Sequence, residues 1–132
     1  MRIGCNIGGV FINVLAYADD LVLLAPSWNA MLQMLTVLHS EFSLRHMSCN
    51  LQKTVCMVFS PKNRARIVSN AFPLLAIGQS CINYVSKFKY LGHTINNGLT
   101  DDDDIGREIR SMFARTNILM CRFGKYSLSV KL

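Results

Sequence analysis

Two apolar runs flank a pair of adjacent carboxylates near the start of the chain, in residues 14–25 (VLAYADDLVLLA). Short runs rich in valine and leucine are typical of strands that are buried on both faces. Two charges in the middle of such a run cannot be buried without partners. The sequence therefore predicts an antiparallel hairpin that presents Asp19 and Asp20 at a solvent-exposed tip.

The two carboxylates at this tip repel each other unless a cation lies between them. Hard oxygen ligands favour Mg²⁺, which usually takes one or two protein carboxylates together with substrate phosphates. An ordinary turn is the competing interpretation, because aspartate is common in turns. The stretch around Asp19 and Asp20 is otherwise apolar, which favours the cation site.

Composition limits the class of protein. The chain has 132 residues, of which 51% are hydrophobic, which predicts one domain or part of one with ample material for a core. No apolar run approaches the roughly 18–20 residues that span a bilayer, and the first residues do not resemble a secretory signal. The five cysteines form no CxxC or Cys/His cluster typical of zinc sites, and Cys56 and Cys81 are predicted to be buried. We therefore expect an intracellular protein, nuclear or cytoplasmic, that is not secreted and has no membrane partner.

The net charge of +6 favours a polyanionic partner. Six of the 8 acidic residues lie in two clusters, Asp19–Asp20 and Asp101–Asp104, while basic residues are spread over the remainder of the chain. Ordinary charge for solubility is the alternative, and composition alone does not exclude it.

Helix and strand patterns follow the predicted hairpin. Ser27 is the expected N-cap of an amphipathic helix that runs to about residue 45 or 47. Apolar runs predict a buried strand at 55–59 and two short strands at 74–77 and 82–85.

Two glycine-containing segments carry further predictions. The glycines in residues 1–13 predict a turn or bulge before the hairpin. Residues 87–95 alternate charged with aromatic and apolar side chains, which predicts one strand with a solvated face. Within it, Gly92 predicts a bulge or a close approach by another backbone.

A second helix is predicted from about residue 105 to 123, with the aspartates before it stabilising its N-terminus rather than binding a metal. Its apolar side chains lie on one face, and its cations lie on the other: Arg107, Arg110, Arg115, Arg122 and Lys125. Such a stripe can follow a phosphate backbone, and a solvated outer face is an equally supported interpretation. The basic loop at 61–66 is expected to be solvated.

Together these elements predict an α+β fold, with an antiparallel sheet centred on the hairpin, one packed helix, and a second helix after the sheet. The order of the motifs resembles the reverse transcriptases of non-LTR, LINE-like retrotransposons. The matching segments are YADD at 17–20, NLQKT at 50–54, FKYLG at 88–92 and the helix start DDIGREI at 103–109. The resemblance implies an incomplete polymerase palm in residues 1–95, followed by the start of a thumb in residues 96–132.

The resemblance also implies roles for individual residues. Asp19 and Asp20 match the two catalytic carboxylates that bind Mg²⁺ or Mn²⁺, and Tyr17 and Ala18 match positions beside the primer end. Lys53 matches the lysine near the phosphates of the incoming nucleotide. The primer grip, which contacts the primer, matches Phe88, Lys89, Tyr90, Leu91 and Gly92. By the same resemblance, the template–primer duplex would be contacted along its backbone by the helix cations Arg107, Arg110, Arg115 and Arg122.

Family members use two divalent ions about 3.5–4 Å apart for nucleotidyl transfer, and a third metal-binding aspartate precedes the hairpin. Here no acidic residue precedes Asp19. We therefore expect a fragment of an RNA-directed DNA polymerase, with template–primer and dNTP as partners, that is inactive unless a missing N-terminal half supplies this carboxylate. A non-catalytic nucleic-acid-binding remnant of a retrotransposon and a functionless translated fragment are the alternatives.

Overall fold

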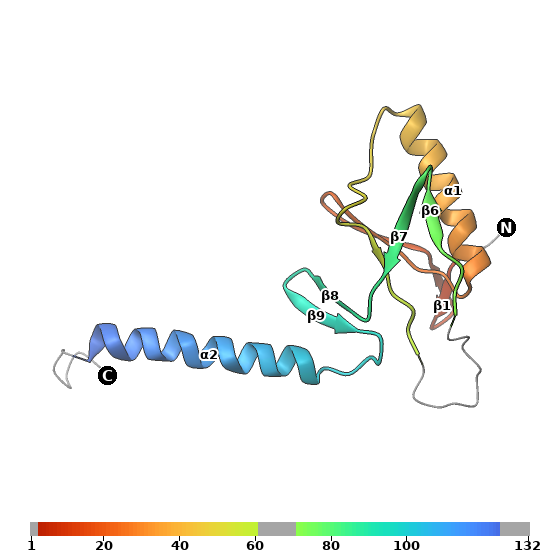
Figure 1. The fold of residues 1–132 in the computed structure, drawn as a ribbon. Helices are drawn as coiled ribbons and strands as arrows, with labels where there is room; N and C mark the ends of the chain where they lie inside the picture. Colours follow the sequence, from red (N-terminus) through yellow and green to blue (C-terminus); the bar gives the residue numbers. More distant parts are fainter. Residues whose placement is uncertain (1–2, 61–70, 125–132) are drawn as a thin grey trace. The chain divides into compact units, whose positions relative to one another are not determined.

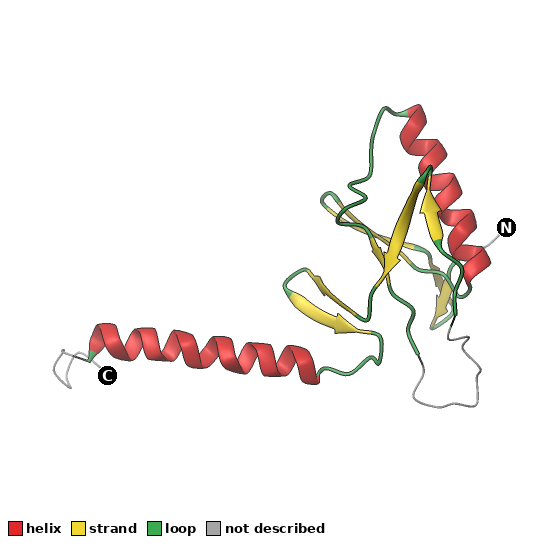
Figure 2. Ribbon diagram, in the orientation of Figure 1, coloured by secondary structure: helices red, strands yellow, loops and turns green. Residues whose placement is uncertain are grey.

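The computed structural model describes residues 3–60 and 71–124 (Figure 1). It combines α-helices with small β-sheets, as predicted for an α+β fold (Figure 2). The described residues group into two units. The first holds residues up to 56 together with 71–84, and the second holds 57–60 and 85–124.

The first unit begins with two consecutive hairpins. Strand β1 (Cys5–Ile7) pairs with β2 (Val10–Ile12), and β3 (Val14–Tyr17) pairs with β4 (Asp20–Leu23), both antiparallel. The β3–β4 pair confirms the predicted hairpin. The glycines at 8–9 form the turn of β1–β2, a hairpin that the sequence did not predict.

The expected burial of this region on both faces is wrong. All four residues of β3 are exposed, and β4 is half-buried only in its second half. Valine and leucine indicate a strand, but whether its faces are covered depends on elements elsewhere in the chain.

Helix α1 (Trp28–Leu44) follows, and the Oγ of Ser27 accepts a hydrogen bond from the Ala30 N–H, which confirms the predicted cap. Strands β6 (Leu75–Ile77) and β7 (Ser80–Tyr84) confirm the two predicted short strands and pair antiparallel. Strand β5 (Val55–Cys56) is shorter than the predicted strand at 55–59 and pairs parallel to β7.

The core of the first unit lies between α1 and the β6–β7 strands. Leu35 of α1 packs there with Leu75, Ile77 and Ile82, all of which are buried. The Pro73 carbonyl, just before β6, accepts hydrogen bonds from two aromatic side chains. These donors are Trp28 Nε1 at 3.0 Å and the Tyr84 hydroxyl at 2.8 Å.

The second unit contains a hairpin and a long helix. Strand β8 (Lys87–Tyr90) pairs antiparallel with β9 (His93–Asn96), so the prediction of one continuous strand at 87–95 is wrong. Leu91 and Gly92 form the turn, with φ of +47° and +89°. Positive φ at both turn residues is the pattern of a type I′ hairpin. No heavy atom lies within 4 Å of where a Gly92 Cβ would be. The positive φ of the turn therefore accounts for this glycine, and a close approach by another backbone does not.

Helix α2 (Asp102–Phe123) begins three residues earlier than predicted, and none of its residues is buried. The first unit therefore has an apolar core, whereas the helix of the second unit leaves its apolar side chains exposed. Exposed apolar patches on this scale mark surfaces that another molecule or segment covers.

Four separate small sheets are present in the described residues, where one sheet centred on the hairpin was expected. Each two-residue turn lets a strand pair with its neighbour in the sequence. Among the described strands, β5 alone pairs outside a hairpin, parallel to β7. Cys56 is half-buried, but Cys81 is exposed, contrary to the prediction. The predicted basic loop at 61–66 and Lys125 lie outside the described residues, and no described helix is long and apolar enough to cross a membrane.

Candidate active site

The β3–β4 hairpin brings Tyr17, Ala18, Asp19 and Asp20 together at one tip. Tyr17 pairs with Asp20 in the register, so the loop consists of Ala18 and Asp19 alone. Ala18 has a φ of +53°. A left-handed backbone costs a non-glycine residue about 1–2 kcal/mol, and such strain is concentrated at functional sites.

The two faces of this hairpin differ in what they contact. Leu23 of β4 packs against the core of the first unit. Side chains alternate along a strand, and directly opposed residues share a face. Asp20 and Tyr17 therefore lie on the face opposite Leu23, directed away from the core, and the Tyr17 side chain is 63% exposed.

Neither carboxylate of the pair has a protein partner within the part of the chain that the structure describes. Both Asp19 and Asp20 are exposed, and no described side chain or backbone N–H donates a hydrogen bond to them. No group of three His, Cys, Asp or Glu side chains suited to a metal occurs in the described ranges. Two unpaired carboxylates fit Mg²⁺ when water and phosphate oxygens complete its ligands.

Lys53 lies in the same unit, in the turn before β5. Its backbone N–H and that of Thr54 both donate to the Asn50 carbonyl, at 3.1 and 3.0 Å, and these bonds fix the turn. The Lys53 side chain is exposed. Among the described residues, no hydrogen bond or ion pair joins it to Asp19 or Asp20, so the structure places these three residues in one unit without direct contact.

The residues predicted to form the primer grip lie in the second unit. Phe88, Lys89 and Tyr90 belong to β8, and Leu91 and Gly92 form the turn that follows. The turn is exposed, with the Leu91 side chain 48% accessible. A tight hairpin therefore presents all five residues as one local group.

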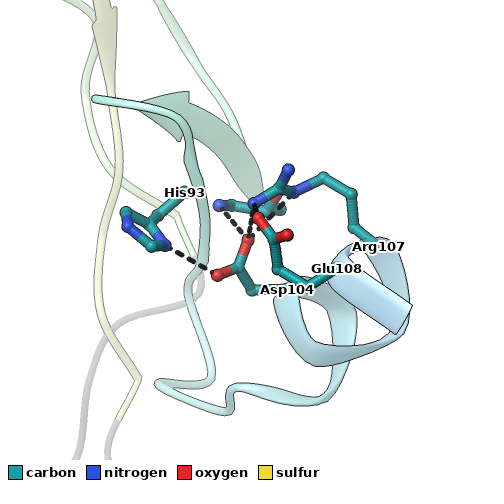
Figure 3. Close-up of polar contacts among 5 residues, drawn as sticks. His93, Asp104, Arg107 and Glu108 are labelled. Carbon is teal, nitrogen blue, oxygen red and sulfur yellow. Dashed lines mark hydrogen bonds and ion pairs between the residues drawn. The ribbon is translucent and has the colours of Figure 1, made fainter. Parts of the chain in front are cut away.

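The first turn of α2 is bonded to this hairpin, an arrangement that the sequence did not predict. Asp104 Oδ1 accepts a hydrogen bond from the Thr94 N–H at 2.8 Å, and its Oδ2 lies 2.9 Å from His93 Nδ1 (Figure 3). Arg107 donates to the same carboxylate from one turn further along, at 2.9 Å. These donors hold the pKa of Asp104 well below its usual range.

Asp103 makes a second set of bonds to the hairpin. Lys87 Nζ lies 2.9 Å from its carboxylate, and Asn96 Nδ2 donates to it at 3.2 Å. The same Asn96 amide bonds to the Thr100 carbonyl at 2.9 Å and is buried. Hydrogen bonds from Lys87 and Asn96 lower the pKa of Asp103.

The expectation that the aspartates serve to cap their own helix is thus corrected. Asp101 occupies the N-cap position, but its side chain makes no capping hydrogen bond. Asp103 and Asp104 are in the first turn, where the macrodipole favours acids, yet their oxygens bond to β8 and β9. We call this cluster the junction; its residues are Lys87, His93, Thr94, Asn96, Asp103, Asp104 and Arg107.

The cations of α2 fall into two classes. Arg107 is paired with Asp104 and with Glu108, the latter at 2.6 Å, so its charge is already balanced within the protein (Figure 3). Arg110, Arg115 and Arg122 are exposed and make no ion pair with any described residue. Of the four arginines expected to contact a nucleic-acid backbone, only these three keep an unpaired guanidinium.

Comparisons with protein-family models, curated proteins and solved structures give no match to this chain. The resemblance to reverse transcriptases therefore depends on the motifs at 17–20, 50–54, 88–92 and 103–109. The exposed, unpaired carboxylates at the β3–β4 tip are the feature with the clearest chemical use.

Proposed function

We propose that the chain is part of an RNA-directed DNA polymerase of the non-LTR retrotransposon type. The observation that supports this most is the tip of β3–β4, a two-residue turn that leaves Asp19 and Asp20 adjacent and exposed. Neither carboxylate has a partner among the described residues, as a pair that binds cations requires. The strained Ala18 and the exposed Tyr17 beside the acids also fit a site that a substrate approaches.

In this proposal each residue has one role. Asp19 and Asp20 bind divalent cations through their carboxylate oxygens. The bound ions would supply activation of the primer hydroxyl and neutralisation of the triphosphate charge. Tyr17, on the same face as Asp20, contacts the primer end. Lys53 adds a positive charge near the phosphates, where negative charge develops during transfer.

The same proposal predicts that residues 1–132 are inactive alone. No acidic residue precedes Asp19 in the sequence, and the described residues contain no three-acid cluster. A third carboxylate would have to come from another polypeptide segment, which would also complete a polymerase palm around the hairpin.

Primer extension tests the proposal. The chain is assayed with an RNA template, a labelled DNA primer, dNTPs and Mn²⁺, alone and joined to the fingers and earlier palm of a related reverse transcriptase. We expect no extension alone and extension by the chimera. Asp19→Ala and Asp20→Ala should each lower the chimera's rate by about a hundredfold or more, whereas Asp102→Ala should not. Extension that survives both hairpin substitutions would contradict the proposal.

A second candidate function is nucleic-acid binding without chemistry. It is favoured by the exposed guanidinium groups of Arg110, Arg115 and Arg122 on one helix. Binding of a labelled RNA–DNA duplex should weaken steeply with salt, and losing one contacting arginine should reduce the log–log slope by about 1. We expect Arg115→Gln to weaken binding more than Arg107→Gln, because Arg107 is already paired. Equal losses would contradict this assignment.

A further inference from the structure

Helix α2 carries an exposed apolar stripe with the spacing of a coiled-coil seam. The stripe, which we call the α2 seam, alternates steps of four and three residues: Ile105, Ile109, Met112, Thr116 and Leu119. This alternation is that of the a and d positions of a heptad repeat. Its apolar members are 45–59% exposed, so nothing in the described part of the chain covers the seam.

The junction leaves the seam accessible. Successive helix residues are about 100° apart, which places Asp103 and Asp104 on the side of α2 opposite Ile105 and Ile109. The β8–β9 hairpin bonds to those two aspartates. A second helix can therefore lie along the seam without displacing the hairpin.

Charge is distributed unevenly along α2. Its first turn holds Asp102, Asp103 and Asp104, and its last turn holds Arg122. Two parallel copies would bring their Asp102 carboxylates together and their Arg122 guanidinium groups together, whereas two antiparallel copies separate these like charges. Helix dipoles favour the same orientation. We propose that α2 pairs with the α2 of a second copy of this chain in antiparallel orientation.

The heptad spacing sets the register of this pair. Ile109 lies opposite Leu119 of the second copy, and Met112 lies opposite its Thr116. Glu108, which flanks the seam and is 54% exposed, then lies beside Arg122 of the second copy, and this ion pair forms twice. Phe113 meets its own equivalent across the two-fold axis and is 62% exposed in the single chain.

One contact in this register is unfavourable. Arg115 flanks the seam on the same side as Glu108 and meets its own equivalent at the axis. Removing this like-charge contact should strengthen the pair. The opposite face, with Arg110 and Ile118, stays exposed, whereas Arg115 and Arg122 lie at the paired surface. The pairing does not depend on the polymerase proposal.

Sedimentation of the full chain over a range of concentrations tests the pairing. We expect a monomer–dimer equilibrium. Phe113→Glu should weaken association by about tenfold or more, because it places two carboxylates at the axis. The matched control is Ile118→Glu, an apolar residue of similar exposure on the opposite face, which should leave association unchanged. A monomer at every concentration, or equal effects of the two substitutions, would overturn the proposal.

Charge reversal tests the orientation and register. Glu108→Arg and Arg122→Glu should each weaken association by about threefold, and the double variant should restore it. Arg115→Gln should strengthen it. Circular dichroism checks that each variant keeps its helix. Failure of the double variant to recover, with helix content unchanged, would exclude this antiparallel register.

Discussion

The β3–β4 and β8–β9 hairpins are similar in construction and differ in how they are held. Both have strands of four residues and a two-residue turn with a positive φ. The β8–β9 hairpin is bonded to α2 through Asp103 and Asp104. The β3–β4 tip carries its own adjacent aspartates, yet no described group donates to Asp19 or Asp20.

This difference shows that the surroundings of an aspartate pair determine its use. At the junction, Lys87, His93, Thr94, Asn96 and Arg107 occupy the carboxylate oxygens. Those oxygens stabilise the structure and are not available to a cation. At the β3–β4 tip the oxygens remain available, at the cost of repulsion between two neighbouring negative charges.

The largest effect that separates the two hairpins should come from removing one carboxylate at each. Asp104→Ala leaves the Thr94 N–H, His93 and Arg107 without their acceptor, so the start of α2 should detach from β9. We expect amide exchange at Thr94 to accelerate by roughly tenfold or more. Asp19→Ala, which removes no contact, should leave exchange within β3 and β4 unchanged.

Asp102→Ala is the matched control, since Asp102 is exposed in the same turn and bonds to no described side chain. Hydrogen exchange followed by NMR measures every variant. If Asp102→Ala accelerated Thr94 exchange as much as Asp104→Ala does, the bonds to Asp104 would not be what holds the junction.

Acidification should act on the junction in a narrow pH range. The pKa values of Asp103 and Asp104 are lowered in the folded chain. Their stabilisation is therefore complete above the ordinary aspartate pKa of about 3.9. It is lost as the pH falls through the lowered values. We expect Thr94 exchange protection, corrected for intrinsic rates, to be unchanged between pH 7 and 5 and to fall only below about pH 4.

The pH profile has a clear contrary result. Because the pKa values of Asp103 and Asp104 are lowered, both carboxylates stay ionised between pH 7 and 5. A junction that loosened between pH 7 and 5 would therefore contradict the assigned role of Asp104.

The smallest effects should come from the two turns, where only one of the two substitutions should destabilise its hairpin. Gly92→Ala places a Cβ at a φ of +89°, and we expect a loss of about 1 kcal/mol in the local stability of β8–β9. Ala18→Gly relieves strain at a φ of +53° and should stabilise β3–β4 slightly or leave it unchanged. Local exchange rates measure both, and a stabilising Gly92→Ala would contradict the turn geometry.

The sequence predicted those parts of the fold in which local chemistry decides the structure. Ser27 and the apolar spacing after it predicted α1, and the apolar runs at 74–77 and 82–85 predicted β6 and β7. The acids within an apolar run predicted β3–β4. In each of these elements the residues that determine the structure lie close together in the sequence.

The errors have physical causes at particular residues. The turn between β8 and β9 was missed because leucine is not a usual turn residue, and Leu91 adopts a positive φ. The junction was missed because the donors to Asp104 include Thr94 and His93 of β9, which only the folded chain brings near it. The sequence did hold one signal for the junction. His93 and Asn96 lie only a few residues before the acids, so a short loop can bring the two groups together.

Manganese binding measured by NMR tests the central claim most directly. Mn²⁺ is added to the isotope-labelled chain, and paramagnetic broadening is recorded residue by residue. We expect broadening centred on residues 17–20, abolished by the combined Asp19→Asn and Asp20→Asn substitutions and little changed by the same substitutions at Asp103 and Asp104. Broadening centred on the first turn of α2, or broadening at the tip that survives loss of both hairpin carboxylates, would contradict the account.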